Sequence, residues 1–164
     1  MISLFQKYNV AGPRYTSYPT VPYWENDTFS YEKWIASVQK SFSESNLSEG
    51  ISVYIHLPFC ESLCTFCGCH KHITKRHEME TPYIDNVLKE WNLYMDLLPE
   101  KPFIKEIHLG GGTPTFFSPE NLNYLLEKIF ERALKAPNFE FSFEGHPNNT
   151  TYEHLKTLAD NGFS

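Results

Sequence analysis

Residues 51–69 read ISVYIHLPFCESLCTFCGC, a short alternating segment followed directly by a run with four cysteines. The alternation of apolar and polar side chains over 51–57 is typical of a β-strand with one buried face. Two more strand patterns follow at 104–109 and 139–144, and a helical pattern follows each of the three. Strands that alternate with helices predict parallel strands joined by right-handed crossovers.

Each of the three helices has a recognisable start. Proline takes the favoured first helical position at Thr81-Pro82 and at Ser118-Pro119. A capping box of Thr150 and Glu153 predicts the third helix, which should end at Gly162. The expected buried face of this third helix consists of Leu155, Leu158 and Ala159.

The alternation also divides each strand into an apolar and a polar face. Ser52, Tyr54 and His56 share the polar face of the first strand, and Glu106 and His108 share that of the second. Both histidines are expected to be hydrogen-bonded core residues rather than ligands. Helices on both faces of a sheet would require continuous apolar runs. We therefore predict an α/β fold, a partial (β/α) barrel with parallel strands whose polar face lines the inside and holds a ligand.

An N-terminal extended segment and helix are expected over 1–49, before the first three barrel units at 50–164. Prolines and aromatic residues without periodicity indicate the extended segment, and apolar positions at helical spacing follow Ser30, a plausible N-cap. Three strands cannot close a barrel, and residues 161–164 lie where a fourth strand should begin. The chain is therefore expected to be truncated after its third βα unit, unless a partner covers the open edge.

Composition excludes several classes of function. The 164 residues include 14 Lys and Arg against 20 Asp and Glu, a net charge of −6. Without a basic cluster that would bind phosphate backbones, no nucleic-acid partner is expected. No stretch approaches the roughly 18 apolar residues of a membrane span, and residues 1–9 lack the pattern of an export signal. We expect a cytoplasmic protein whose cysteines are reduced.

The first three cysteines, Cys60, Cys64 and Cys67, have the spacing C-x3-C-x2-C, which lets a short loop place three thiolates around one face of a cuboidal cluster. A [4Fe-4S] cluster normally takes four thiolates, so three leave one iron free for a bidentate amino-acid ligand. Two alternatives stay open, a structural zinc site and a set of unligated buried thiols. Zinc sites usually pair two separated knuckles, and buried thiols seldom cluster by chance.

Three loops are expected to meet on one rim, because sites in parallel βα architectures form after the carboxyl ends of the strands. These loops contain the cysteines, the run GGGTPT at 110–115 and the segment EGHP at 144–147. The glycine run matches neither the phosphate-binding loop nor the dinucleotide fingerprint. It either lets another group approach the backbone closely or forms a plain tight turn.

The segment from YIHLPFC at 54–60 to CGC at 67–69, followed by GGGTPT, resembles the radical S-adenosylmethionine (SAM) enzymes. The fourth cysteine, Cys69, and the segment GPRYTSYPT at 12–20 make the chain more narrowly similar to the oxygen-independent coproporphyrinogen III oxidases, or dehydrogenases, of haem biosynthesis. The resemblance runs from about Tyr8 to the end and covers well under half of a full family member. It implies a partial barrel of the radical SAM type.

The resemblance implies that Cys60, Cys64 and Cys67 ligate a [4Fe-4S] cluster, whose fourth iron binds the amino and carboxylate groups of SAM. The implied SAM contacts are Tyr54, Phe66, Gly111, Gly112, Thr113 and Glu144. Carbonyls of the glycines and the threonine hydroxyl would accept from the SAM ammonium, and the glutamate would hydrogen-bond the ribose. On their own, the two aromatic residues would be taken for core residues.

Four other residues have no settled role. Cys69 is not expected to bind iron, and it is a catalytic candidate together with Arg14, a hypothetical contact for a substrate propionate. His70 and His146 stand at positions where many relatives have other residues, and their roles are open.

The activity implied by the resemblance is oxygen-independent oxidative decarboxylation of coproporphyrinogen III to protoporphyrinogen IX through a SAM-derived 5′-deoxyadenosyl radical. It implies a porphyrinogen substrate and an electron donor such as flavodoxin or ferredoxin, and we expect the full-length protein to be a monomer. The alternatives are a haem chaperone with the same barrel and a zinc-stabilised interaction module. A third expectation is that these 164 residues alone are inactive, because the rest of the barrel should supply further contacts.

Overall fold

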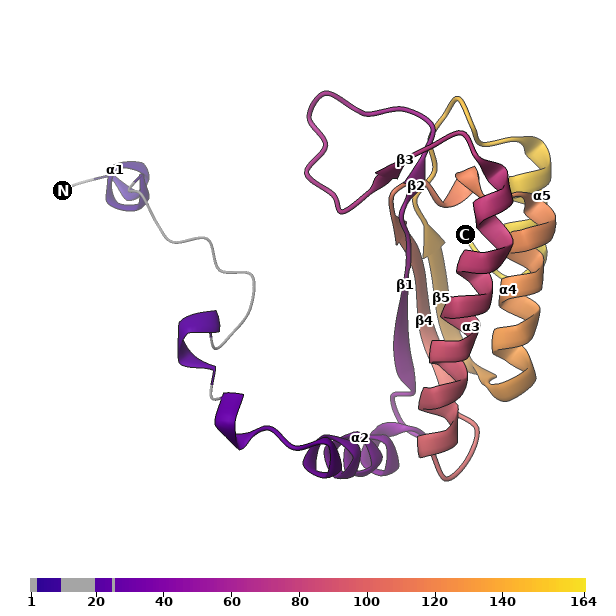
Figure 1. The fold of residues 1–164 in the computed structure, drawn as a ribbon. Helices are drawn as coiled ribbons and strands as arrows, with labels where there is room; N and C mark the ends of the chain where they lie inside the picture. The colour runs from indigo at the N-terminus through magenta and orange to yellow at the C-terminus, as the bar shows by residue number, and fades with distance from the viewer. Residues whose placement is uncertain (1–2, 10–19, 25) are drawn as a thin grey trace. The chain divides into compact units, whose positions relative to one another are not determined.

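The computed structural model describes residues 3–9, 20–24 and 26–164, which divide into two compact units, Met1–Trp34 and Ile35–Ser164 (Figure 1). Arg14 and the rest of 10–19 lie outside the described residues, so the expected role of Arg14 is untested. The division of the chain after residue 49 stays a prediction.

The first unit contains short helical stretches in the part of the chain expected to be extended. They are α1 (Leu4–Tyr8), η1 (Val21–Tyr23) and η2 (Asn26–Thr28). A capping box of Ser3 and Gln6, in which the Gln6 N–H donates to Ser3 Oγ over 3.2 Å, explains the first of them. Helix α2 (Tyr31–Ser45) follows Ser30 as predicted, and the Ser30 hydroxyl accepts from the Lys33 N–H.

The second unit is a parallel sheet covered by helices. Strands β1 (Ile51–Leu57), β4 (Phe103–Gly111) and β5 (Leu134–Phe143) are all parallel and lie in the order β1-β4-β5. Helices α3 (Glu80–Leu97), α4 (Pro119–Arg132) and α5 (Tyr152–Asp160) lie on the same face of this sheet (Figure 1). The predicted partial (β/α) barrel is confirmed.

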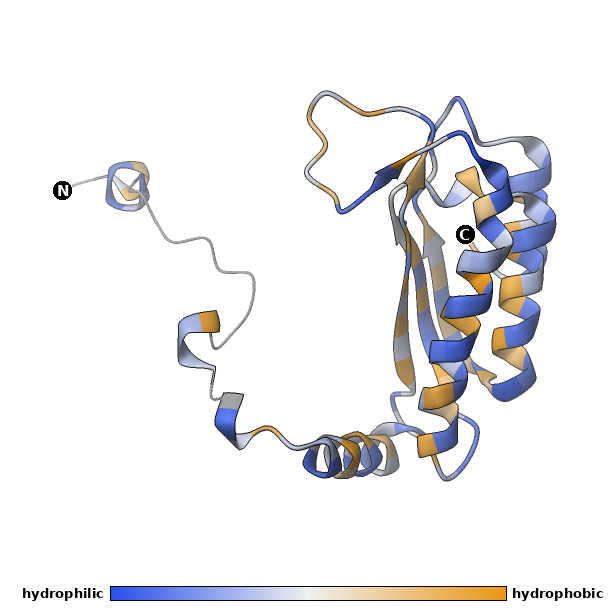
Figure 2. Cartoon of the chain, in the orientation of Figure 1, coloured by the Kyte–Doolittle hydropathy of each residue, from blue (hydrophilic) through white to orange (hydrophobic). Residues whose placement is uncertain are grey.

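The core lies between the sheet and these helices. Figure 2 shows apolar and polar residues alternating along the strands, and in β1 the side chains of Ile55 and Leu57 are buried while Tyr54 is 58% exposed. The helices contribute apolar stripes, including Ile84 and Leu88 from α3. The strand faces assigned from the alternation are therefore correct.

Helix α5 begins one residue later than the capping pattern predicts. Its N-cap is Thr151, which forms a capping box with His154 instead of the expected pairing of Thr150 with Glu153. A shift of one residue rotates a helix by roughly 100°. Leu155 and Ala159 are therefore exposed, whereas Leu158 is buried as predicted and His154 is buried with it. The reason is a hydrogen bond that His154 Nε2 donates to the carbonyl of Phe117 over 2.9 Å.

Strand β5 begins at Leu134, five residues before the predicted start. Its pairing with β4 is irregular between Ile104 and Glu106, so residues 136–139 do not follow the regular ladder. Pro137 lies in this part and is tolerated because β5 is at the edge of the three-stranded sheet. Near the other end, the Ser164 N–H donates to the Phe141 carbonyl over 3.1 Å, so residues 163–164 lie along β5 where a fourth strand is expected.

The N-terminus of α3 is joined to that of α4 by the buried carboxylate of Glu80, which is 2% exposed. Its Oε2 atom accepts from the Ser118 N–H (2.8 Å) and from Asn121 Nδ2 (2.7 Å). Its Oε1 atom accepts from His77 Nδ1 over 2.6 Å, in η3 (His77–Met79). This hydrogen bond, more than any other contact, raises the pKa of His77.

Replacing Glu80 with alanine should lower the free energy of unfolding by about 1–3 kcal/mol, because buried donors lose their acceptor. The raised pKa of His77 means that its bond to the carboxylate stabilises fully below the ordinary histidine pKa of about 6.5 and is lost as pH rises through the folded-state pKa. The decrease in the free energy of unfolding caused by Glu80→Ala should therefore be larger at about pH 5.5 than at about pH 8.5, as measured by urea unfolding. Glu90→Ala, at an exposed position of the same helix, is the control. Equal decreases in the free energy of unfolding of the two variants would contradict the prediction.

Within the described part of the chain, none of the helices has the combination of length and apolar character needed to cross a membrane.

Candidate functional site

The cysteine loop, residues 60–71, is closed at its base by two short strands that the sequence did not reveal. Strands β2 (Phe59–Cys60) and β3 (His72–Ile73) pair in parallel. The His72 N–H donates to the Pro58 carbonyl, and the Thr74 N–H donates to the Cys60 carbonyl, each over 2.8 Å. Both ends of the loop are thereby fixed to the end of β1.

The glycine loop, residues 110–115, lies against residues 57–59 at the end of β1. The Gly112 N–H donates to the Leu57 carbonyl and the Thr113 N–H donates to the Phe59 carbonyl, each over 2.9 Å. Gly111 has a φ of +108°, and an added Cβ there would lie 2.5 Å from the His56 ring. An added Cβ on Gly112 would lie 2.5 Å from backbone atoms of Pro58. Because the glycines have no side chain, the glycine loop can approach the backbone at the end of β1 closely. This was one of the two expectations for the glycine run.

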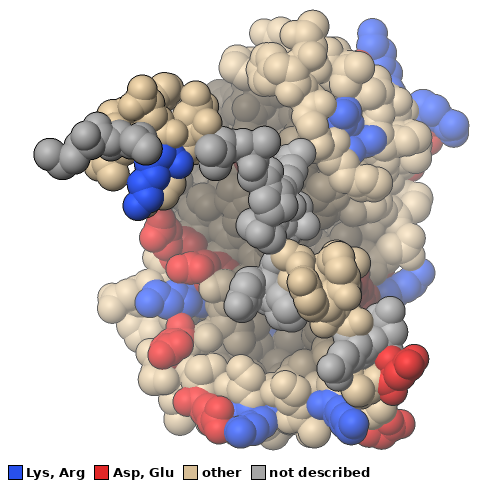
Figure 3. All heavy atoms as spheres, turned by 90° about the vertical axis from the view of Figure 1, so that its left-hand side faces the viewer, with Lys and Arg blue, Asp and Glu red and all other residues tan. Residues whose placement is uncertain are grey.

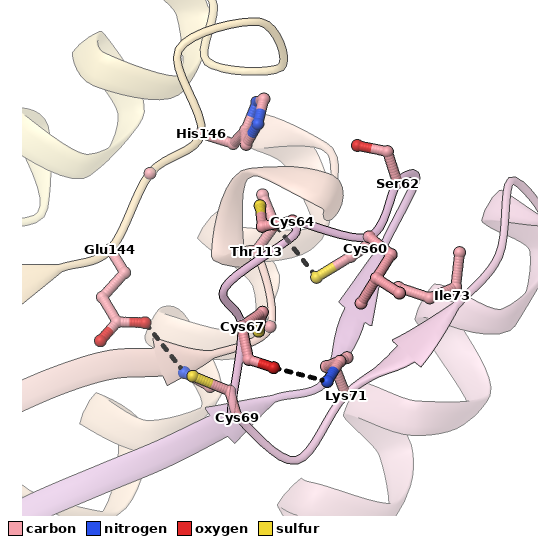
Figure 4. A pocket seen from close by; sticks show the side chains of 14 residues that line it. Cys60, Ser62, Cys64, Cys67, Cys69, Lys71, Ile73, Thr113, Glu144 and His146 are labelled. Carbon is pink, nitrogen blue, oxygen red and sulfur yellow. Dashed lines mark hydrogen bonds between the residues drawn. The ribbon is translucent and has the colours of Figure 1, made fainter.

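The three predicted rim loops line one pocket of about 190 Å³ (Figure 4). The cysteine loop contributes all four cysteines and Lys71, the glycine loop contributes residues 111–113, and the loop after β5 contributes residues 144–146. Cys60 and His146, which are 86 residues apart in the sequence (146 − 60), thus border the same pocket. The prediction of a common rim is confirmed.

The four thiols are all free, but they differ in exposure. Cys60 is buried and accepts a hydrogen bond from Thr113 Oγ1 over 3.3 Å, which Figure 4 shows. Cys64 and Cys67 are half-buried, and Cys69 is exposed. A set of buried structural thiols does not describe this arrangement, because only the first thiol is inside the core.

The cysteines supply the sulfur donors that an iron–sulfur cluster requires. Among the described residues, no three His, Cys, Asp or Glu side chains are gathered closely enough to hold one metal ion. Three thiols from one loop nevertheless border the same pocket, and a cuboidal cluster, which is larger than one ion, is bound by thiolates spread around it. The residues present fit an iron–sulfur cluster in the chemistry of their donors.

The neighbouring thiols of Cys67 and Cys69 are electrostatically linked. A hydrogen bond from the backbone of Cys69 lowers the pKa of Cys67, and the nearby charge of Lys71 lowers it further. Lys71 Nζ donates to the Cys67 carbonyl over 3.3 Å. The hydrogen bond with the Cys67 side chain raises the pKa of Cys69. The two thiols therefore influence each other's ionisation.

Tyr54 and His56 form a hydrogen-bonded chain on the polar face of the sheet. The Tyr54 hydroxyl donates to His56 Nδ1 over 3.1 Å, and His56 Nε2 donates to the His70 carbonyl over 2.8 Å. Partial burial raises the pKa of Tyr54, with smaller contributions from Glu144 and Cys69. Tyr54 is therefore no core residue, and His56 is hydrogen-bonded as predicted but half-buried rather than part of the core.

Glu144 lies at the carboxyl end of β5 and faces the glycine loop. Its Oε2 atom accepts from the Gly111 N–H over 3.1 Å, and its Oε1 atom is 3.6 Å from His108 Nε2. Phe66 is 91% exposed, which excludes a core role and leaves its expected packing over a cofactor as a prediction. His146 lines the pocket, and its Nδ1 atom accepts from the Asn148 N–H over 3.3 Å.

Charges of both signs are distributed over the face in Figure 3, where Lys and Arg side chains lie among Asp and Glu side chains. On the described atoms of this view, no large basic patch is seen.

A parallel βα half-barrel with three spaced cysteines at the carboxyl rim is the arrangement of radical SAM proteins, and the sequence profile of the radical SAM superfamily matches residues 54–164. The chain is 39% identical to an oxygen-independent coproporphyrinogen III oxidase from Helicobacter pylori over 98% of its length, and 36% identical to one from Mannheimia haemolytica over 89%. The solved structure of a coproporphyrinogen III oxidase from Escherichia coli, described as a radical SAM enzyme, matches 91% of the chain with a TM-score of 0.75 and 30% identity. The chain therefore belongs to the radical SAM superfamily and, within it, to the family of oxygen-independent coproporphyrinogen III oxidases.

The chain covers different fractions of the lengths of these relatives. The chain spans 35% of the Helicobacter pylori relative, 33% of the solved Escherichia coli chain and 95% of the Mannheimia haemolytica relative.

Proposed function

We propose that this chain forms the cluster- and SAM-binding part of an oxygen-independent coproporphyrinogen III oxidase, which converts coproporphyrinogen III to protoporphyrinogen IX. The names of the relatives support the substrate. The observation that carries the proposal is that three spaced thiols, the glycine loop and Glu144 border one pocket.

Cys60, Cys64 and Cys67 would hold a [4Fe-4S] cluster through their thiolates. When bound, the cluster supplies one electron, from a donor such as flavodoxin or ferredoxin, for the reductive cleavage of SAM to methionine and a 5′-deoxyadenosyl radical. The buried Cys60, fixed by Thr113 and by the pairing of β2 with β3, gives the loop its rigid starting point. The remaining two thiols border the open side of the pocket.

The residues opposite the cysteines would bind and orient SAM. The carbonyls of Gly111 and Gly112 and the Thr113 hydroxyl are proposed to accept from its ammonium group, and Glu144 is proposed to accept from the ribose hydroxyls. Tyr54 would contact SAM from the polar face of β1. These groups lie on strand ends or are held by backbone hydrogen bonds, which favours a fixed position for the bond to be broken.

Two further residues, Cys69 and Phe66, are kept as candidates. Cys69 has an exposed thiol at the pocket and is proposed to act there rather than as an iron ligand. Phe66 is proposed to pack over the cluster or the adenine, since its exposed ring has no partner in the core.

Anaerobic reconstitution with iron and sulfide tests the proposal. The protein is expected to take up about four iron atoms and four sulfides per chain, and the electron paramagnetic resonance spectrum of the reduced protein should change when SAM is added. Bound zinc in place of iron, or an iron spectrum that does not respond to SAM, would contradict it. Release of carbon dioxide from coproporphyrinogen III by the holoenzyme tests the substrate separately.

A further inference from the structure

His108 lies on the polar face of the sheet, between three parts of the candidate site. Its ring stacks on the ring of Tyr54, with centroids 5.8 Å apart and planes 15° from parallel. Its Nε2 atom is 3.6 Å from Glu144 Oε1, and its Nδ1 atom is 2.9 Å from Ser142 Oγ. An added Cβ on Gly110 would lie 2.9 Å from the same Nε2 atom, so the glycine loop packs against this ring as well.

The neighbours of the His108 ring determine where its proton lies. The Glu144 carboxylate can only accept, and it faces Nε2, so the tautomer with a proton on Nε2 is favoured. Nδ1 then accepts from the Ser142 hydroxyl. His108 and Ser142 are partners in the register of β4 with β5, so two adjacent strands hold the ring and the hydroxyl. The N–H that faces Glu144 is therefore fixed by a rigid part of the fold.

Glu144 itself stands just beyond the end of β5, and its side chain is 53% exposed. An exposed glutamate has rotamer freedom that it must lose when it binds a ligand. The Gly111 N–H contacts one carboxylate oxygen and His108 contacts the other. Together the two contacts select one orientation of the carboxylate, which lowers the entropic cost of binding.

We propose that His108 is a positioning residue for SAM, which holds Glu144 in the orientation that binds the ribose hydroxyls. The inference rests on the proposed function, because it takes the ribose of SAM as the ligand of Glu144. His108 lies on the sheet rather than in the cysteine loop, so its replacement should weaken SAM binding without removing iron.

A double-mutant cycle on SAM binding by the cluster-loaded protein tests this role, with His108→Ala, Glu144→Gln and the combined variant. We expect His108→Ala to raise the Kd of SAM about tenfold, because the Glu144 carboxylate loses one of the two contacts that orient it. Because the histidine acts through the glutamate, the combined variant should bind SAM no more weakly than Glu144→Gln alone. His72→Ala, an exposed imidazole on β3, is the matched control and should bind SAM like the wild type.

Ser142→Ala is a second variant, which keeps the imidazole and removes only the hydroxyl that fixes it. It should weaken SAM binding less than His108→Ala, and the effect should vanish when Glu144 is already glutamine. Wild-type affinity in His108→Ala, or losses that add in the combined variant, would overturn the positioning role while wild-type SAM binding stands. A wild-type protein that holds iron and binds no SAM would instead overturn the proposed function, and this inference with it.

Discussion

Cys64→Ser is expected to lose most of the iron and sulfide that the wild-type protein retains after anaerobic reconstitution. Serine replaces a thiolate by a hydroxyl that stays protonated, which leaves two of the three proposed ligands. Loss of a residue that merely supports a metal ligand already costs about 10–100-fold in metal affinity, so loss of a ligand should cost at least about tenfold. Iron and sulfide per chain, measured after removal of unbound metal, give the result.

Cys64 is a better choice for this test than Cys60. Cys60 is buried and bonded to Thr113, so its replacement would disturb packing as well as iron binding. Cys64 is half-buried, and the pairing of β2 with β3 does not include it. Unchanged unfolding of the iron-free variant would show that the loss of iron arises at the site.

Cys69→Ser is the matched control, because Cys69 lies in the same loop with only Gly68 between it and Cys67. The Cys69 thiol is exposed, and its hydrogen bond with the Cys67 side chain raises its pKa. Cys69→Ser should retain the iron and sulfide of the wild type. If Cys69→Ser lost as much iron as Cys64→Ser, or if Cys64→Ser lost none, the proposed set of three ligands would be wrong.

The sequence predicted the parts of the fold that depend on local periodicity. The alternation over 51–57 matches β1 to the residue, and it placed Tyr54 and His56 on the polar face correctly. The common rim followed from topology alone, since parallel strands end on the same edge. These predictions needed no knowledge of which distant residues touch.

The features that sequence analysis missed are held by contacts between distant residues. Strands β2 and β3 have two residues each, too few for any period to appear. His154 is buried because it bonds a carbonyl 37 residues away, so its polar side chain gave a misleading pattern. The contacts of His108 with Ser142 and Glu144 likewise cross from one strand to the next, and only the register of β4 and β5 reveals them.

Gly112→Ala should lower the free energy of unfolding of the iron-free protein by about 1–3 kcal/mol, the usual cost of forcing a side chain into a packed site. The added Cβ would lie 2.5 Å from the carbonyl carbon and oxygen of Pro58 and 2.9 Å from the carbonyl oxygen of Leu57. These are backbone atoms, which cannot rotate away as a flexible side chain can. Either the end of β1 moves or the hydrogen bond from the Gly112 N–H to Leu57 breaks. Denaturant unfolding followed by circular dichroism measures the loss.

Gly68→Ala provides the control for Gly112→Ala, because an added Cβ at Gly68 would meet nothing within 4 Å. Its free energy of unfolding should stay within about 0.5 kcal/mol of the wild type. Gly111 would be a less informative choice than Gly112, since its φ of +108° would add backbone strain to the steric clash. Gly112 is not among the described glycines with a positive φ. Its alanine variant therefore tests the close backbone approach alone. If Gly112→Ala unfolded at the same denaturant concentration as Gly68→Ala, the glycine loop would not lie against β1 as the structure has it.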